Sequence, residues 1–179
     1  MKNWKTIKSK TVFRCPYFKI LDEDFLVPSG KKYKYYIMER GDYVVVIAKE
    51  KNCFYLVELY RYTTKLRAPE FVAGAVEKNE TPLQAAKKEL KEETGITAKK
   101  VRKIGWYFAY RGCSNQKAHI FLAEELKFNE QELEDLEREG KTKVKKFKIS
   151  EVEKMIKSGK IKDSDTIAAF NIFRLKRKQ

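Results

Sequence analysis

The sequence predicts an α+β protein, an α/β/α sandwich, because strand-type and helix-type segments alternate along its 179 residues. Hydrophobic residues make up 42% of the chain and aromatic residues 13%, which is enough to bury a core. The continuous apolar run at residues 43–48 is typical of a buried strand, and residues 81–95 carry helix start and stop signals. The length suits one domain, or one domain with a small appendage.

The first forty residues read as a separate β unit. We expect strands at residues 4–15, 18–27 and 33–39, because Pro16 and a Pro-Ser-Gly turn interrupt three strand-type runs. We therefore divide the chain into an N-terminal β-strand unit, residues 1–41, and a main domain, residues 42–179.

The main domain is predicted to alternate strands with helices. Its strands are expected at residues 43–48, 54–60, 71–76, 101–110, 118–126 and 142–149. The turn Lys51-Asn52 makes the first two a central hairpin. The acidic stretch 129–140 reads as a loop or a short helix. Ser150 with Glu153 forms a capping box that opens a helix, and Asp163 or Ser164 caps a final one.

A helix is predicted between a capping Thr81, with Pro82 at the first helical position, and Gly95, which can end it in a left-handed conformation. Its apolar stripe comprises Leu83, Ala86 and Leu90.

Three glutamates gather near the end of this helix. Glu89 and Glu93 share one face, and Glu92 lies beside them. The last turn of a helix carries partial negative charge, which disfavours each carboxylate by about 0.3–1 kcal/mol, and the acids also repel one another. A bound divalent cation would reverse both penalties.

The segment from residue 74 to residue 96 resembles the Nudix box. In that motif a Gly is followed after five residues by a Glu, and seven further residues lead to Arg-Glu-apolar-any-Glu-Glu-any-Gly-apolar. The matching positions are Gly74, Glu80, Glu89, Leu90, Glu92, Glu93, Gly95 and Ile96. Lys88 stands where the family usually has Arg. The alternative, a solvated helix whose acids pair with nearby lysines, does not explain the Gly, the offset to Glu80 and the acidic last turn together.

The resemblance extends to the ADP-ribose pyrophosphatase branch of the family. It is carried by the three-strand leading unit, Tyr60-Arg61-Tyr62, residues 70–74, the turn Gly112-Cys113-Ser114 and the ending Ser-Gly-Lys-Ile-Lys-Asp. It implies the Nudix fold, a mixed β-sheet between helices. In that branch the N-terminal strands swap between protomers, so we expect a homodimer joined through residues 1–41. The alternative is that residues 1–40 extend the monomer's own sheet.

The activity that the resemblance implies is metal-dependent hydrolysis of a nucleoside diphosphate sugar, with ADP-ribose as first choice, giving AMP and ribose 5-phosphate. The metal ligands carried over are Glu89, Glu92, Glu93 and the backbone carbonyl of Ala73. Oxygen ligands without a supporting His or Cys favour Mg²⁺, and Mn²⁺ would fit the same set.

The catalytic residues carried over are Glu92, Glu93 and Lys88, together with a general base on the loop before the last strand, where Glu137 and Glu139 are the candidates. A plain solvated acidic loop is the alternative at those two positions. Lys88 supplies a point charge and cannot form the bidentate pair that Arg makes, so a weaker enzyme is one expectation.

Substrate contacts are expected from residues outside the box, namely Arg61, Arg67, Glu70, Arg111, Gly112 and Ser114. Arg61 could contact a phosphate or form a structural salt bridge. Glu70 could hydrogen-bond a metal-bound water or be an ordinary edge-strand residue.

Composition bounds the compartment and the partners. The 40 basic and 25 acidic residues give a net charge of +15, which fits either a lysine-rich proteome with solvated faces or a functional field for phosphate-bearing ligands. The three cysteines are far apart and form no metal-ligand pair, which favours reduced thiols in a cytosol. We expect a cytoplasmic protein, because no segment reads as a membrane span or signal peptide.

Two other functions stay open. Box chemistry does not separate ADP-ribose from GDP-mannose, an oxidised nucleotide or a dinucleoside polyphosphate, since pocket walls set the leaving group. A catalytically weak Nudix module that binds RNA is the non-enzymatic alternative. We expect no nucleic-acid partner, because modules of that kind usually lose acids of the box, and Glu89, Glu92 and Glu93 are all present.

Overall fold

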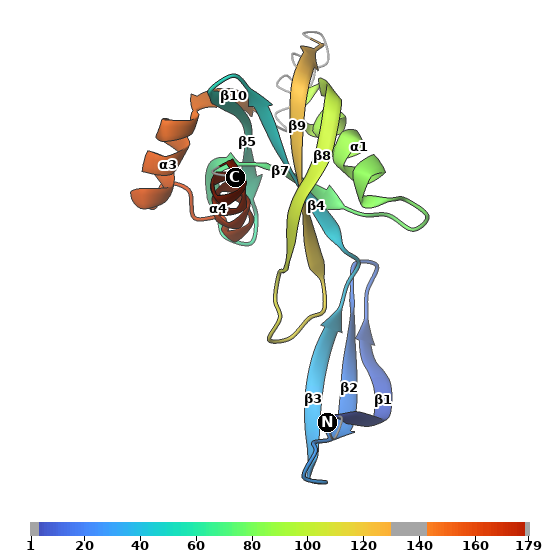
Figure 1. Cartoon of the computed structure of the whole chain (residues 1–179). Coiled ribbons are helices and arrows are strands. Elements are labelled where there is room, and N and C mark those ends of the chain that lie inside the picture. Colours follow the sequence, from blue (N-terminus) through green and yellow to red (C-terminus); the bar gives the residue numbers. More distant parts are fainter. Residues whose placement is uncertain (1–3, 130–142, 178–179) are drawn as a thin grey trace. The chain divides into compact units, whose positions relative to one another are not determined.

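The computed structural model describes residues 4–129 and 143–177 (Figure 1). Its elements are, in chain order, β1 (Lys5–Arg14), β2 (Lys19–Leu26), β3 (Lys32–Glu39), β4 (Tyr43–Glu50), β5 (Cys53–Arg61), β6 (Leu66–Glu70), β7 (Val72–Ala75), α1 (Pro82–Thr94), β8 (Ile96–Phe108), β9 (Lys117–Phe128), β10 (Lys143–Lys148), α3 (Ile149–Lys157) and α4 (Ser164–Arg177). No helix within the described residues is long and apolar enough to cross a membrane.

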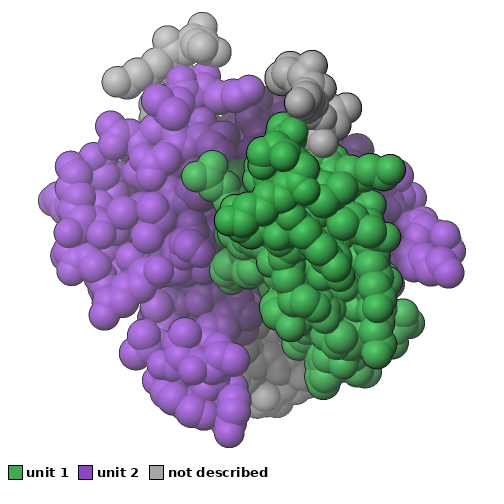
Figure 2. Space-filling model, turned by 90° about the horizontal axis from the view of Figure 1, so that it is seen from below, with its two compact units in different colours: residues 1–42, 107–117 green, residues 43–106, 118–179 purple. Residues whose placement is uncertain are grey.

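The chain forms two compact units (Figure 2). The first unit comprises residues 1–42 and the loop segment 107–117, and the second comprises residues 43–106 and 118–179. The first unit thus takes in the end of β8, the connection to β9 and the first residue of β9, in addition to the N-terminal strands.

The first unit is a three-stranded antiparallel sheet in the order β1-β2-β3. β2 and β3 pair without interruption from Lys19 opposite Glu39 to Leu26 opposite Lys32. Every residue of β1 is exposed. The 107–117 segment attaches to β3, because the Met38 N–H donates to the Cys113 carbonyl at 2.7 Å.

The second unit is built on a seven-stranded mixed sheet in the order β10-β5-β4-β9-β8, with β6 on β5 and β7 on β4. β4 pairs parallel with β9 and antiparallel with β5 and β7. The predicted central hairpin is confirmed as β4–β5, and Lys51 in its turn has φ +51°. Pro69 lies in β6, which pairs only with β5 within the described sheet, a position where its missing N–H is tolerated.

Both faces of this sheet are covered, which makes the predicted sandwich. Alternate residues of β4 point to opposite faces, so Val44, Val46 and Ala48 join the core under α1, where Ala86 and Leu90 pack. On the other face, Phe54 contacts three rings, those of Phe71, Phe170 and Phe173. Figure 1 shows α1 on one side of the sheet and α3 and α4 on the other.

Several predicted boundaries were wrong. β8 begins at Ile96 and not at residue 101, and β6 was not predicted at all. Helix α3 begins before Ser150, and the Lys148 N–H donates to Glu151 at 2.7 Å in place of the predicted Ser150–Glu153 box. Glu153 instead pairs with Lys157 and Arg174, each at 2.9 Å. The acidic stretch after Asn129 lies outside the described residues.

Candidate active site

Helix α1 begins and ends where its capping residues were predicted to place it. The Gln84 N–H donates to Thr81 Oγ1 at 3.3 Å, and the Thr81 N–H donates to Gln84 Oε1 at 2.8 Å, which completes a capping box. Gly95 ends the helix at φ +64°, and its N–H donates to the Lys91 carbonyl at 2.8 Å. These caps fix which way the glutamates of the last turns point. One detail differs: Leu83 is partly exposed, and the buried residues are Ala85, Ala86, Leu90 and Thr94.

Glu89 lies directly against the backbone of β7, at Gly74. A Cβ atom at Gly74 would stand 2.0 Å from Glu89 Cδ and 2.2 Å from Glu89 Oε2. No side chain fits that distance, so the glycine of the motif is required by the approach of this carboxylate to the strand. Burial raises the pKa of Glu89, and the nearby Lys88 partly offsets that rise.

Glu93 is the most strongly perturbed acid of the site. Burial, followed by the negative charge of Glu89, raises its pKa to about 7, although Arg61 and a hydrogen bond from the Ala73 N–H oppose the shift. Its Oε2 atom is buried and accepts no hydrogen bond from any described residue. A buried carboxylate oxygen without a donor is costly, so this atom marks a place where a cation or donor would be favourable.

The donor set suits a hard divalent cation. Glu89 and Glu93 share one face of α1 beside β7, and Glu92 is exposed in the same turns. All these donors are oxygens, which match the preference of Mg²⁺ and Mn²⁺. Within residues 4–129 and 143–177, no three His, Cys, Asp or Glu side chains already converge in a geometry that would hold a metal ion. The case for a divalent cation therefore depends on the oxygen chemistry of these side chains and on their closeness. The structural observation that supports it is the buried Glu93 oxygen without a hydrogen-bond donor.

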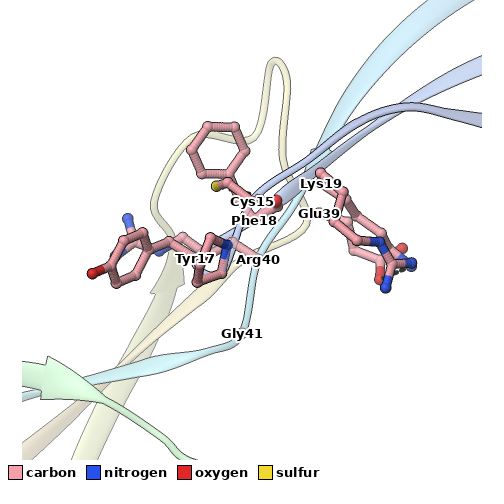
Figure 3. Close-up of a pocket in the computed structure, with 9 residues that line it drawn as sticks. Cys15, Tyr17, Phe18, Lys19, Glu39, Arg40 and Gly41 are labelled. Atoms are coloured by element: carbon pink, nitrogen blue, oxygen red, sulfur yellow. Dashed lines mark hydrogen bonds and ion pairs between the residues drawn. The ribbon is translucent and has the colours of Figure 1, made fainter.

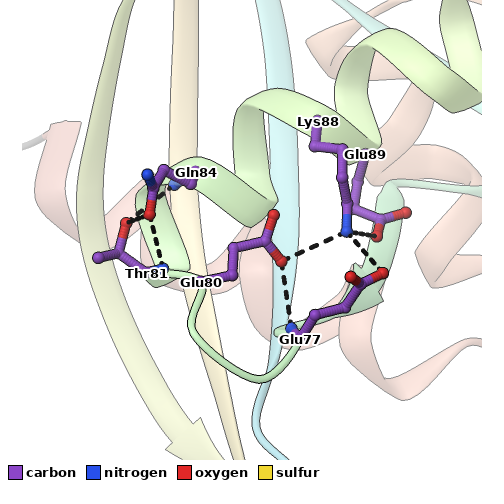
Figure 4. A network of polar contacts seen from close by, with 6 residues as sticks. All are labelled: Glu77, Glu80, Thr81, Gln84, Lys88 and Glu89. Atoms are coloured by element: carbon purple, nitrogen blue, oxygen red, sulfur yellow. Dashed lines mark hydrogen bonds and ion pairs between the residues drawn. The ribbon is translucent and has the colours of Figure 1, made fainter.

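Lys88 joins the loop before α1 to the helix (Figure 4). Its Nζ atom lies 3.0 Å from Glu77, 3.3 Å from Glu80 and 3.8 Å from Glu89. Glu80 also accepts a hydrogen bond from the Glu77 N–H at 3.1 Å, so it closes the loop from the inside. The pair with Glu77 raises the pKa of Lys88. Lys88 acts here as one positive charge shared among three acids.

Arg61 and Glu70 form an ion pair beside this cluster. Arg61 donates from Nε at 2.8 Å and from Nη2 at 2.6 Å to the same oxygen of Glu70, whose side chain is buried. Glu70 is thus the largest cause of the raised pKa of Arg61, to which the charge of Glu93 also contributes. Arg67 is exposed and donates to the Glu58 carbonyl at 3.1 Å. The salt bridge, which was one of the two roles that the sequence left open for Arg61, is present in the structure.

The remaining predicted residues do not belong to this cluster. Arg111, Gly112 and Ser114 lie in the first unit, where Tyr35 donates to the Gly112 carbonyl and Ser114 Oγ accepts from the Gln116 N–H at 3.1 Å. The two candidates for the general base, Glu137 and Glu139, lie outside the described residues.

The first unit contains a pocket of about 390 Å³ (Figure 3), lined by Arg14, Cys15, Pro16, Tyr17, Phe18, Lys19, Glu39, Arg40 and Gly41. Lys19 and Glu39 neutralise each other at 2.7 Å. Arg14 and Arg40 make no ion pair with another described residue. Tyr17, whose ring is exposed, also lines this pocket and lies between Arg14 and Arg40 in the sequence. An aromatic ring with two guanidinium groups that pair with no described acid suits a planar base that carries phosphate.

Comparison with known proteins decides the family. The model of the NUDIX domain matches residues 38–170. This chain belongs to the NUDIX family. The resemblance seen in the box is thereby confirmed, and the match begins before β4 and ends inside α4.

Two curated proteins resemble this Nudix chain over nearly its whole length. An ADP-ribose pyrophosphatase of Bacillus subtilis is 32% identical over 96% of this chain and 93% of its own length. A methanol dehydrogenase activator of Bacillus methanolicus is 28% identical over 96% of this chain and 92% of its own. Among solved structures, one described as an ADP compounds hydrolase superposes with a TM-score of 0.83, covering 99% of this chain and 96% of that one, at 17% identity. That likeness confirms the fold.

Some residues of the first-unit pocket and of the box loop were not singled out from the sequence. Arg14, Tyr17 and Arg40 were not among the predicted substrate residues, because nothing local distinguishes them from the other basic and aromatic residues of a chain with 40 cations. Glu77 was also missed as a partner of Lys88, eleven residues away, although its place in the box loop could have suggested it.

Proposed function

We propose that this Nudix protein hydrolyses the pyrophosphate bond of a nucleoside diphosphate sugar, with ADP-ribose as the first choice of substrate. Water would add to one phosphorus while the bridging phosphorus–oxygen bond breaks, giving AMP and ribose 5-phosphate. The observation that supports this best is Glu93, a buried acid with an orphaned oxygen beside Glu89 on the box helix. The Bacillus subtilis relative, whose name is ADP-ribose pyrophosphatase, supports the substrate.

Glu89, Glu92, Glu93 and the Ala73 carbonyl are proposed to hold the metal, with Mg²⁺ as first choice and Mn²⁺ as second. A cation bound there would neutralise charge on the two phosphates and lower the pKa of a bound water. Burial supports the role of Glu93, because desolvation strengthens an electrostatic contact that replaces its lost hydration.

The protein's own cations would orient the substrate. Glu70 holds Arg61 through Nε and Nη2, which leaves Nη1 free of that acid and able to donate to a phosphate oxygen. Lys88 would keep the Glu89 carboxylate ionised and close to β7. For the general base we retain Glu137 and Glu139, and for further phosphate contacts Arg67 and Arg111 with the turn at Gly112 and Ser114.

The pocket of the first unit is proposed to bind a nucleotide through its own residues. Tyr17 would stack on the base, and Arg14 and Arg40 would pair with phosphate oxygens. Replacing Tyr17 by Ala is expected to raise the Kd of this pocket for AMP in titration calorimetry, because the stacking contact with the base is lost.

The first unit is also proposed to join a second copy of the chain. One face of its sheet carries a row of stacked rings, with centroids 5.4 Å apart for Trp4 and Phe25 and 6.0 Å apart for Phe25 and Tyr33. Trp4 is 68% exposed and Tyr33 44% exposed in the single chain. Contiguous exposed aromatic surface of this kind favours association, and the branch resemblance points to a homodimer. Light scattering should report twice the 21.1 kDa chain mass, with Trp4→Ala shifting the protein toward one copy.

A nucleotide-sugar screen with product identification tests the function. Purified protein with Mg²⁺ should release AMP and ribose 5-phosphate from ADP-ribose, and Glu93→Gln should lower kcat by at least about 100-fold. Lys87→Gln, an exposed change on the same helix, should keep kcat within about twofold and controls for perturbation of α1. Faster turnover of GDP-mannose would change the substrate, while tight, steeply salt-dependent RNA binding without turnover of any nucleotide would overturn the proposal.

A further inference from the structure

The backbone changes partner at Phe71, between the two short strands that flank the candidate site. β6 ends at Glu70, paired with Val57 of β5, and β7 begins at Val72, paired with Val46 of β4. Phe71 itself belongs to neither strand and is buried. Its N–H therefore needs a partner from outside the sheet, because a buried donor without one is strongly disfavoured.

Helix α4 supplies that partner through Thr166. The Phe71 N–H donates to Thr166 Oγ1 at 3.0 Å, and Thr166 has no exposed surface. Thr166 is in turn held by the start of its helix, because its own N–H donates to Asp163 Oδ2 at 2.7 Å. A side chain 95 residues away in the sequence thus sets the position of the backbone at the crossover.

The residues on either side of the crossover touch the groups that the proposed reaction needs. One residue before it, Glu70 holds the guanidinium of Arg61. Two residues after it, the Ala73 N–H donates to Glu93. A shift of the crossover would therefore move the phosphate-binding candidate Arg61 and the acid Glu93 at the same time.

We propose that Thr166 is a positioning residue for the Nudix reaction, and that it acts by fixing the β6–β7 crossover through its hydrogen bond to the Phe71 N–H. The inference rests on the proposed hydrolase function for its catalytic readout. Its structural readout, the protection of the Phe71 amide, is independent of any substrate. Thr166 contacts no substrate in this role.

The test compares Thr166→Val, which keeps the shape and removes the hydroxyl, with Thr166→Ser, which keeps the hydroxyl. In Thr166→Val we expect the Phe71 amide to exchange at least about tenfold faster in NMR hydrogen exchange. We expect kcat to fall about 10- to 100-fold with KM changed less than about twofold, since misplacement of reacting groups by about 1 Å has that effect. Thr166→Ser should restore both values to within about threefold.

A matched control separates positioning from loss of stability. Val152→Ala removes buried methyl groups from α3, an element outside β6, β7 and α1, so it should lower the melting temperature while leaving kcat unchanged. If Thr166→Val lowers kcat no more than Val152→Ala at equal loss of stability, or if Thr166→Ser fails to rescue, the proposal is overturned.

The wild-type protein provides a further test that needs no variant to fold. Slow exchange of the Phe71 amide is expected, and exchange as fast as that of an exposed loop amide would overturn the proposal. Failure of the wild type to hydrolyse any nucleotide sugar would instead overturn the proposed function and leave the amide measurement to decide on the hydrogen bond.

Discussion

Replacing Glu93 by Gln should stabilise the metal-free protein above neutral pH. The folded-state pKa of Glu93 is raised from 4.5 to about 7, mainly by burial and then by the charge of Glu89. The folded state therefore binds this proton more tightly than the unfolded state. In the wild type, the contribution of Glu93 to stability is full below pH 4.5, is lost as pH rises from 4.5 to 7, and is constant above that.

The size of the effect follows from the shift. Each pKa unit corresponds to about 1.4 kcal/mol, so a shift of this size destabilises the ionised wild type by about 3 kcal/mol at pH 8. Gln resembles the protonated acid and does not titrate. Glu93→Gln should thus match the wild type near pH 4 and exceed it by up to about 3 kcal/mol at pH 8.

Urea unfolding in EDTA at pH 4.5, 6 and 8 measures this difference directly. Glu92→Gln serves as the matched control, because Glu92 is exposed in the same helical turn and should give no comparable gain. Added Mg²⁺ should narrow or reverse the difference, since a ligand that binds only the folded wild type stabilises it by mass action. Equal stability of wild type and Glu93→Gln at pH 8 in EDTA would refute the reasoning on desolvation.

Three further changes probe the neighbouring contacts. Gly74→Ala should displace the flexible Glu89 carboxylate while sparing the fold, so kcat should drop about 100-fold with less than about 1 kcal/mol lost in urea unfolding; normal kcat contradicts this. Lys88→Arg should raise kcat/KM severalfold, because the planar guanidinium group of Arg can form two hydrogen bonds with Glu89. Unchanged kinetics would show that the single positive charge of Lys88 is sufficient. Arg61→Lys loses two hydrogen bonds to Glu70 and should cost about 1–3 kcal/mol in urea unfolding and raise KM, whereas wild-type KM would assign Arg61 a purely structural role.

The sequence predicted those parts of the site that depend on local chemistry. The N-cap at Thr81, the left-handed Gly95 and the shared face of Glu89 and Glu93 each follow from residues in or next to one helix, and the structure contains all of them. Helix capping acts over three or four residues, so it is readable without knowledge of the fold. The buried β4 was predicted for a similar reason, because its apolar run is continuous.

The features that the sequence did not predict depend on contacts between residues far apart in the chain. The five residues of β6 look like a polar loop, and only their register against β5 makes them a strand. That register also places Arg61 beside Glu70, so the salt bridge is present, and the phosphate contact stays a prediction. The contact between Thr166 and Phe71 spans 95 residues and leaves no local signal. Long-range contacts of this kind carry no periodicity or spacing that a single sequence shows.

The reason for the glycine of the Nudix box, Gly74, becomes visible only in the structure. Gly74 could have been a turn residue, but its φ is not in the left-handed region, and what forbids a side chain is the carboxylate of Glu89 at 2.0 Å. The bare strand therefore lets the Glu89 carboxylate approach, and on the same helix face the packing around Glu93 removes water from its carboxylate and raises its pKa. The same close packing thus creates the electrostatic cost that a divalent cation would offset. Glu93→Gln keeps the packing and removes the charge, so it should lose this cost together with its activity, and stability and kcat are expected to move in opposite directions.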